Sequence, residues 1–259
     1  MTLYVNGDSH SAGAELIKDY CFAEDDPKYA ELGRQAHPDA VPLTYGFKLA
    51  QALSTWFVPD AESASSNERI LRTTQAHVDR MEAFFTQPNA IQDPDDLIVI
   101  GWSSWEREEW KDSSDNYIQV TASGTDSVPE EFGDRYKQWV INQTLDVVRE
   151  KCKYWHDKIW DLHEQLDDKG MRHIFFNSYN HFDVDEPRDW GASYINPYEQ
   201  SGTYYHWLQN QGFKTVKYGS QHYGEDGHDA WVKFLLTWLT SRTSSSIITN
   251  TKTVNPAQD

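Results

Sequence analysis

Residues 3–11 read Leu3-Tyr4-Val5-Asn6-Gly7-Asp8-Ser9-His10-Ser11, a short apolar run followed at once by Gly-Asp-Ser and then by a helical pattern. A short apolar run bounded by turn residues is typical of a strand that is buried on both faces of a parallel sheet. The turn places Ser9 at the carboxyl end of that strand and at the start of a helix, where backbone N–H groups carry positive partial charge. The stretch therefore predicts an α/β fold with a serine at one edge of its sheet.

Short apolar runs and helical patterns alternate along the rest of the chain, and this rhythm is typical of the α/β class. Ser66 and Gly170 stand where the start of one helix and the end of another need a cap. The expected strands are Leu3–Asn6, Thr55–Val58, Leu97–Gly101, His173–Asn177 and Lys214–Tyr218, and the expected helices cover residues 43–53, 67–85, 134–168 and 229–240.

Two histidines, His156 and His163, lie seven residues apart in the longest of these predicted helices. That spacing places them on one face, but no Glu-x-x-His pattern of a metal site accompanies them. The sequence therefore predicts two histidines at the surface or at an edge, and a protein without a metal ion or another cofactor.

A chain of 259 residues is long enough for one large α/β domain but short for two. We expect a single domain over residues 1–241, with insertions near 102–132 and 180–207, and an extended or disordered polar tail over 242–259. Both insertions are rich in Trp and Tyr, whose rings stack well on sugars. The alternative is that these rings hold irregular loops together, and the sequence leaves both interpretations open.

Charge and hydropathy exclude several classes of partner. The chain carries 41 Asp and Glu residues against 23 Lys and Arg, a formal net charge of -18, which repels nucleic-acid backbones and anionic lipids. No apolar run approaches the ~20 residues of a membrane-spanning helix, and no basic and apolar leader precedes the first strand. We expect a soluble protein without a signal peptide, in the cytoplasm of the producing cell, with no nucleic-acid partner, no membrane insertion, and Cys21 and Cys152 as reduced structural thiols.

The sequence also suggests a nucleophile and its base. A serine hydroxyl needs a neighbouring base before it attacks a carbonyl carbon, and His228 directly precedes the last predicted helix. Two carboxylates, Glu225 and Asp226, come three and two residues before that histidine. Either could hold the imidazole in the tautomer that removes the Ser9 proton. This pattern predicts acyl transfer through an acyl-enzyme on Ser9.

Four segments, in this order along the chain, resemble the signature blocks of the SGNH, or GDSL, hydrolase family. They are Gly7-Asp8-Ser9, the run from Ala61 to Ile70, the run from Leu97 to Arg107, and Glu225-Asp226-Gly227-His228. The resemblance implies a flavodoxin-like three-layer α/β/α sandwich with a central, mostly parallel five-stranded sheet, and the activity of a serine esterase or lipase. The blocks also resemble those of GDSL-type proteins encoded by marine bacteriophages, which adds association with a virion as an alternative location.

The family closes an oxyanion hole around the nucleophile, and this chain departs from the family pattern at two positions. Where the second block usually has glycine, the chain has Ala64 or Ser65, so we expect an ordinary backbone N–H there and no glycine conformation. Where the third block usually has asparagine, the chain has Ser103, whose hydroxyl has a shorter reach. The resemblance implies an oxyanion hole formed by Ser9, Ala64 or Ser65, and Ser103, with Asn67 as a substitute donor.

The remaining candidates concern the substrate. We expect Trp102, Trp105, Arg107 and His222 to contact it, and His222 is also the reserve candidate for the base. A small-molecule or carbohydrate ester with a short acyl group is favoured, because no long apolar lid segment is evident, and lipid esters stay open. Two alternatives stand beside hydrolysis: an acyltransferase, and a binding or structural protein that keeps the fold without turnover.

Overall fold

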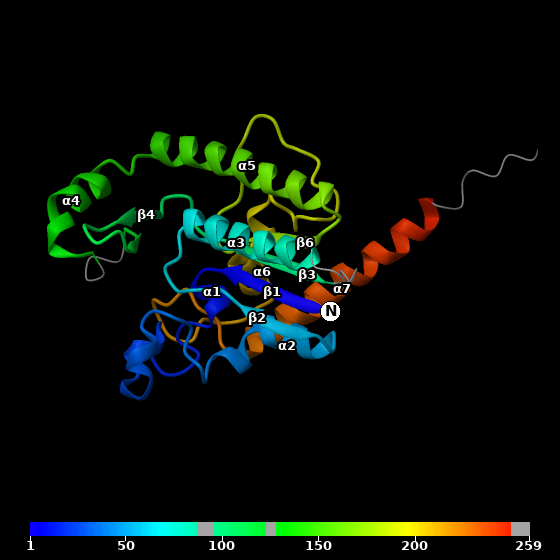
Figure 1. Cartoon of the computed structure of the whole chain (residues 1–259), viewed down its shortest axis with the longest axis horizontal. Helices are drawn as coiled ribbons and strands as arrows, with labels where there is room; N and C mark the ends of the chain where they lie inside the picture. The colour runs from blue at the N-terminus through cyan, green and yellow to red at the C-terminus, as the bar shows by residue number, and fades with distance from the viewer. Residues whose placement is uncertain (87–95, 123–127, 250–259) are drawn as a thin grey trace, which may run out of the picture.

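The computed structural model describes residues 1–86, 96–122 and 128–249. A parallel four-stranded sheet with the order β2-β1-β3-β6 lies at its centre, and β4 and β5 form a separate antiparallel pair (Figure 1). The strands are β1 (Thr2–Gly7), β2 (Trp56–Pro59), β3 (Leu97–Trp102), β4 (Glu108–Lys111), β5 (Tyr117–Val120) and β6 (Arg172–Asn177), and the α-helices are α1 (Ser9–Ala12), α2 (Tyr45–Ala52), α3 (Asn67–Phe85), α4 (Gly133–Ile141), α5 (Leu145–Asp168), α6 (Tyr204–Asn210) and α7 (Glu225–Thr249).

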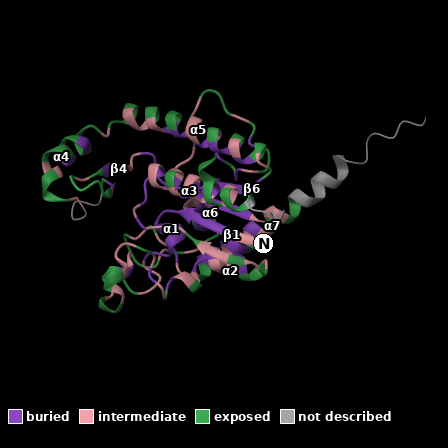
Figure 2. Ribbon diagram, in the orientation of Figure 1, coloured by how far each residue is buried: buried purple, intermediate pink, exposed green. Residues whose placement is uncertain are grey.

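Alternation of side chains along the central strands builds one core on each face of the sheet. Successive residues of a strand point to opposite faces, so Tyr4 belongs to one core while Leu3 and Val5 belong to the other. The first core includes Ile70 of α3 and Ile159 of α5, and the second includes buried residues of α2, α6 and α7. Figure 2 shows β1 buried between these helices, and β3 and β6 are buried along most of their length, whereas the edge strand β2 is intermediate to exposed. The three layers confirm the predicted α/β/α class.

The sheet has four strands and not the predicted five. The first four predicted strands form as β1, β2, β3 and β6, but residues 214–218 do not form a strand. The backbone there pairs through a single antiparallel bridge between Thr215 and Tyr223. The side chains of Val216 and Tyr218 are exposed, so the run lacks the half-buried packing that stabilises a strand.

The long helix predicted over residues 134–168 is two helices. Helix α4 ends at Ile141 and α5 begins at Leu145, with Thr144 as its N-cap. The Thr144 hydroxyl oxygen accepts a hydrogen bond from the Val147 N–H at 3.3 Å. A threonine side chain that accepts from the first turn favours a new helix start, and the apolar periodicity does not reveal this break.

Helix α5 turns both of its histidines inward. His156 and His163 are buried, with 3% and 7% of their surface exposed, which contradicts the predicted surface or edge position. His156 Nε2 lies 3.0 Å from the hydroxyl of Tyr198, which comes from the second insertion. The Tyr198 hydroxyl thus satisfies the His156 imidazole, which the helical pattern alone would place outside the core.

The two insertions are built differently. Residues 102–132 include the β4–β5 hairpin, and α4 packs on that hairpin in a small separate core, whereas residues 180–207 are largely irregular until α6. The irregular part contributes aromatic side chains to the core beside α5, as the second interpretation of its composition predicts. These side chains are Phe182, Trp190, Tyr194 and Tyr198.

Helix α7 extends at both ends beyond the prediction. It begins at Glu225 and continues to Thr249, through the first part of the segment predicted as a tail, and residues 250–259 lie outside the described ranges. Within the described parts of the chain, no helix combines the length and apolar character needed to cross a lipid bilayer.

Candidate active site

The carboxyl end of β1 presents Ser9 at the start of α1. Asp8 is the N-cap of this helix, and its side chain accepts a hydrogen bond from the His10 N–H at 3.1 Å. Ser9 therefore occupies the first helical position, where the N–H has no acceptor within the helix and can serve a ligand. Ser9 is buried, with 7% of its surface exposed, so only a small part of the residue is accessible to solvent.

A close approach of three backbone segments holds this turn in place. Gly7 has a φ of +154°, and a Cβ on it would lie 2.3 Å from Ser11 Oγ and 2.8 Å from the Gly101 carbonyl oxygen. Glycine is the residue that fits there, because any side chain would separate β1 from β3 or push α1 outward. The glycine of Gly-Asp-Ser thus has a packing function.

The buried carboxylate of Asp8 joins the ends of three strands. Besides the His10 N–H, it accepts hydrogen bonds from the hydroxyls of Ser103 at 3.0 Å and Ser178 at 3.1 Å. Arg107 Nη1 lies 3.4 Å from Oδ2, the same carboxylate oxygen that accepts from Ser103. Ser103 follows β3 and Ser178 follows β6. A buried carboxylate is tolerated when donors surround it in this way.

This network uses groups that the sequence assigned to the oxyanion and the substrate. Ser103 has one hydroxyl proton, which it donates to Asp8, while its oxygen accepts from Arg107 at 2.9 Å. Arg107 also donates to the Ser65 carbonyl oxygen at 3.4 Å. In this arrangement Ser103 has no hydroxyl proton left to donate to an oxyanion. Arg107 holds the Asp8 carboxylate and the Ser103 hydroxyl in place.

Asn67, the substitute donor, is engaged with the same strand end. Its Oδ1 accepts from the Ser103 N–H at 2.8 Å, and its Nδ2 donates to the Ser103 carbonyl oxygen at 3.2 Å. These paired bonds attach the first residue of α3 to the residue that follows β3. The amide therefore acts as a clamp between two elements in this structure.

Ala64 adopts a backbone conformation that the sequence did not predict. Its φ is +60°, in the left-handed region that favours glycine, so a turn that usually takes glycine is formed here with an alanine. The Ser65 N–H donates to the Glu62 carbonyl oxygen at 3.2 Å. Among the described residues, no acceptor pairs with the Ala64 N–H. Of the two candidate oxyanion donors, Ala64 and Ser65, Ala64 is therefore the one whose backbone N–H is available.

His228 is buried and is held by a backbone hydrogen bond from α2. It is 2% exposed, and its Nδ1 accepts a hydrogen bond from the Tyr45 N–H at 3.1 Å. A nitrogen that accepts from a backbone N–H carries no proton, which assigns the proton to Nε2. Burial, with smaller contributions from the charges of His10, Lys48 and His222, lowers the pKa of His228 to about 3.

Neither carboxylate predicted beside His228 reaches its ring. Glu225 pairs with Lys48 Nζ at 2.7 Å, and Asp226 accepts a hydrogen bond from the Gly227 N–H at 2.9 Å. In the described structure no hydrogen bond joins either carboxylate to His228. The expected histidine–carboxylate pair is not formed there, because Nδ1 already faces the backbone of α2.

A different histidine has a carboxylate partner. His222 Nδ1 lies 2.6 Å from Glu15 Oε2, across 207 positions of sequence. Lys217 Nζ pairs with the other Glu15 oxygen at 2.7 Å, and the Ser220 hydroxyl also donates to Glu15. Burial raises the pKa of Glu15, but hydrogen bonds from Lys217, Ser220 and His222 outweigh it and lower that pKa to about 2. Glu15 is therefore an anion aimed at Nδ1.

His10 is next to the serine in the chain and next to His222 in space. It directly follows Ser9, and its ring centroid lies 5.3 Å from that of His222 and 5.4 Å from that of Tyr204. Burial lowers the pKa of His10 to about 4, although the Asp8 charge opposes this effect. In the described structure no hydrogen bond joins the Ser9 hydroxyl to His222 or His228; such contacts are often loose in enzymes without substrate.

Spacing could not have revealed Glu15 as a site residue. It follows α1 in a turn where its own φ is +63°, and no sequence motif links it to residue 222. A non-glycine residue in this backbone region is a local strain that clusters at functional positions. Only the folded chain brings this strained turn against the loop before α7.

Two residues assigned to the substrate belong to the core. Trp102 is fully buried and meets Phe175 edge to face at 5.6 Å, while Trp105 stacks on Phe182 at 4.8 Å. Their rings therefore pack against protein, which replaces the predicted substrate contacts. The other two members of that predicted set keep partly exposed side chains, at 18% for His222 and 17% for Arg107.

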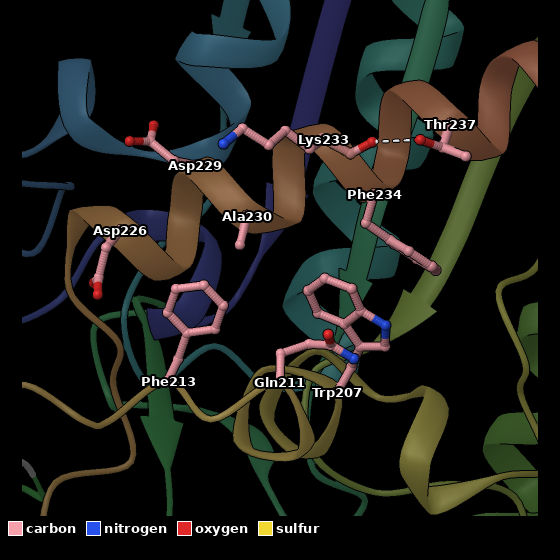
Figure 3. A pocket seen from close by; sticks show the side chains of 9 residues that line it. All are labelled: Trp207, Gln211, Phe213, Asp226, Asp229, Ala230, Lys233, Phe234 and Thr237. Carbon is pink, nitrogen blue, oxygen red and sulfur yellow. Dashed lines mark hydrogen bonds between the residues drawn. The ribbon is translucent and has the colours of Figure 1, made fainter.

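Two neighbouring hollows lie along α6 and the segment that leads to α7, and the first of them extends onto α7. The larger, of about 600 Å³, is lined by Trp207, Phe213 and Phe234 together with Asp226 and Asp229. Figure 3 shows its aromatic rings gathered below α7, with the two aspartates at the start of that helix.

The smaller hollow, of about 380 Å³, lies closer to the histidines. It shares Phe213 with the larger one and adds Tyr205 and Tyr223. The ring centroid of Tyr205 lies 6.5 Å from that of His10. An aromatic surface thus leads from the His10–His222 contact to α7.

Comparison with known proteins gives distant structural likenesses. No family model matches the chain, and no curated protein sequence matches it. One solved structure is a carbohydrate esterase whose active site displays divergent catalytic and non-catalytic binding functions, with a TM-score of 0.40, 14% identity, and coverage of 92% of this chain and 68% of that one. Another is an acetyl xylan esterase from the rumen bacterium Butyrivibrio proteoclasticus, with a TM-score of 0.40, 12% identity, and coverage of 94% of this chain and 64% of that one. The chain spans about two thirds of the length of these structures, and similarities this low do not establish its activity.

Proposed function

We propose that the protein is a serine hydrolase of the GDSL type that cleaves carboxylic esters, with Ser9 as nucleophile, His222 as general base and Glu15 as the carboxylate that orients the base. The observation that carries the proposal is the 2.6 Å contact between His222 Nδ1 and Glu15 Oε2, beside the helix that begins with Ser9. A carboxylate on Nδ1 leaves Nε2 as the nitrogen that takes a proton.

In the proposed reaction, His222 Nε2 takes the Ser9 hydroxyl proton while Ser9 Oγ attacks the ester carbonyl carbon. The carbon–oxygen bond to the alcohol then breaks, and the alcohol leaves with the proton from His222. Water, activated by the same nitrogen, hydrolyses the acyl-enzyme. The Ser9 and Ala64 N–H groups are the proposed oxyanion donors, because neither is paired within the described structure.

His228 has a structural role in this proposal. Its Nδ1 is taken by the Tyr45 N–H, and its pKa of about 3 makes it a poor base at neutral pH. The sequence placed Glu225 and Asp226 in the triad. In this proposal Glu225 instead forms an ion pair with Lys48, and Asp226 lines the larger hollow.

A carbohydrate ester with a short acyl group is the favoured substrate. The aromatic hollows beside the site offer Tyr205, Phe213 and Trp207 as stacking surfaces, and the carboxylates of Asp226 and Asp229 can accept hydrogen bonds from sugar hydroxyls. Lipid-ester cleavage is the less favoured specificity. An acyltransferase would form the same acyl-enzyme and differ only in the acceptor.

One observation favours a binding protein on the same fold as the second candidate. The Ser103 hydroxyl proton is committed to Asp8, so the third oxyanion donor is missing, and the loss of one such donor lowers rates by about 100- to 1,000-fold in other enzymes. A protein with so few donors can bind esters without turning them over. Such a binding protein could be associated with a virion or reside in the cytoplasm.

Active-site labelling distinguishes the two candidates. A fluorophosphonate should add one label per chain, and Ser9→Ala should abolish labelling together with hydrolysis of a chromogenic acetate ester. The exposed Ser114 provides the control Ser114→Ala, which should behave as wild type. A folded wild type that neither labels nor hydrolyses the ester would support the binding protein. Comparison of an acetylated sugar with a long-chain ester then tests the substrate class.

A further inference from the structure

We propose that His163, Asp167 and His173 form a site for one divalent transition-metal ion, Zn²⁺ foremost, that joins α5 to β6. Two imidazole nitrogens and one carboxylate oxygen from these residues all lie within 4.8 Å of one another. Two histidines and a carboxylate are a donor set that zinc accepts, with water in the fourth position. The proposal is independent of the ester chemistry at Ser9.

The local chain course brings the three donors together. His163 and Asp167 are four residues apart on α5, so they lie on one face, one turn from each other. The helix ends one residue later, and Gly170, with a φ of +65°, reverses the chain. Strand β6 then returns beside the last turn of α5 and carries His173 at its second position. All three donors therefore come from eleven consecutive residues.

The hydrogen bonds of His173 prepare one nitrogen for a metal. Its Nδ1 lies 2.9 Å from the Met171 carbonyl oxygen, and because a carbonyl only accepts, Nδ1 carries the proton. The lone pair is then on Nε2, which points at His163 Nδ1 from 2.7 Å. A carbonyl bound to the far nitrogen of an imidazole is the usual second layer around a metal-binding histidine.

A bound ion would replace a proton shared between the two rings. Zinc–nitrogen bonds of about 2.0–2.1 Å at tetrahedral angles separate two nitrogens by about 3.3 Å. The present 2.7 Å separation therefore opens by about 0.6 Å when His163 Nδ1 gives up its proton. The Asp167 side chain is exposed, so it can rotate toward the ion and leaves a path from solvent.

Packing restrains both rings in the orientation that the site needs. The His163 ring lies 5.0 Å from Trp160 and 5.5 Å from Trp190, and the His173 ring lies 4.8 Å from Phe175, between centroids. Both histidines are buried, at 7% and 2% exposure. Ligands held by packing lose little freedom when an ion binds. The proposal departs from the expectation of a protein without a metal site, and His156 is not one of the proposed ligands.

The position of the site separates it from the ester chemistry. His173 stands at the beginning of β6, in register with Ile98 of β3, whereas Ser9 follows the end of β1. In a parallel sheet the beginnings and the ends of the strands form opposite edges. The proposed ion therefore fastens a helix to the sheet and has no part in acyl transfer.

The test is metal binding by the full chain after treatment with a chelator. Calorimetric titration with Zn²⁺ should give one ion per chain, Co²⁺ should give the visible absorption of a tetrahedral site, and Zn²⁺ should raise the melting temperature. Asp167→Asn and His163→Gln should each weaken Zn²⁺ binding at least about tenfold, since even second-layer partners contribute about 10- to 100-fold.

Two further measurements keep the proposal open to refutation. Asp167 is exposed, so Asp167→Asn tests the site even where a buried histidine variant fails to fold. The control is His206→Gln, which removes a half-buried imidazole of α6 and should leave Zn²⁺ binding unchanged. Absence of Zn²⁺ binding by wild type at about 100-fold excess, unchanged affinity in Asp167→Asn, or equal loss in the control would overturn the proposal in favour of a metal-free histidine pair that shares one proton.

Discussion

His222 and His228 stand six residues apart, and the fold uses them in opposite ways. The loop before α7 keeps His222 partly exposed and sets a Glu15 carboxylate on its Nδ1. The first turn of α7 buries His228 and sets a Tyr45 backbone N–H on the same ring nitrogen. The first arrangement favours a base with a free Nε2, and the second favours a neutral ring that holds two helices together. Proximity to an acid in sequence therefore does not identify a catalytic histidine.

The largest expected effect separates the two histidines by activity. His222→Ala should lower kcat/KM for a chromogenic acetate ester by about 10⁴-fold or more, because the base is lost. His228→Asn should lower it less than about tenfold in the folded fraction. Steady-state kinetics, with circular dichroism to verify folding, provides the measurement. The reverse order of effects would return the base to His228.

Glu15 should have the next largest effect. Glu15→Gln keeps the shape of the side chain but removes the charge that holds His222 Nδ1–H, so kcat should fall by about 100- to 10,000-fold while KM changes little. Single-turnover and steady-state kinetics on the same ester check this split.

The matched controls are the two carboxylates near His228. Glu225→Gln and Asp226→Asn should each change kcat less than about threefold, because neither reaches an imidazole in the structure. A larger loss in Asp226→Asn than in Glu15→Gln would contradict the proposed pairing.

The pH dependence of stability should report on the buried histidine. The folded pKa of His228 is lowered from 6.5 to about 3, so as pH falls below about 6.5 the unfolded chain takes up a proton that the folded chain does not. The contribution of this group to the free energy of unfolding is therefore largest above that pH. It falls toward pH 4 by up to about 1.4 kcal/mol per pH unit.

Urea unfolding at pH 7, 6 and 5 measures this slope. His228→Asn should reduce this slope by the equivalent of about one bound proton, because the titrating ring is removed. His10, whose pKa is lowered to about 4, contributes a slope of the same sign that remains in the variant. An unchanged slope in His228→Asn would show that the ring is not buried in its neutral form.

The smallest effect is expected away from both histidines, at Ala64. Ala64→Gly relieves a positive φ but adds freedom to the unfolded chain, so the two contributions oppose each other and the free energy of unfolding should change by less than about 1 kcal/mol. The backbone N–H is kept, so kcat/KM should change less than about threefold. Urea unfolding and ester kinetics check both values, and a large loss of activity would mean that the alanine methyl group itself shapes the site.

Local patterns predicted most of the scaffold correctly. The strand before Gly7 and the helix that opens at Asn67 follow from short apolar runs and from a Ser66 cap, and both form where the sequence places them. The run at residues 214–218 has the same local character but is left exposed, so it does not become a strand. The sequence likewise assigns Trp102 to the substrate, and only packing shows that it belongs to the core.

The sequence by itself determined the α/β class, the place of Ser9 at the carboxyl end of the first strand, and the acidic character of the surface, because periodicity, turn chemistry and charge are local or additive. Tertiary structure alone decided which histidine has a carboxylate partner and which donors near Ser9 are already used. Glu15 and His222 are 207 positions apart, and a hydrogen bond depends on distances of a few ångströms that no spacing along the chain encodes. The network around Asp8 shows the same limit, since residues of three strand ends compete there for one carboxylate.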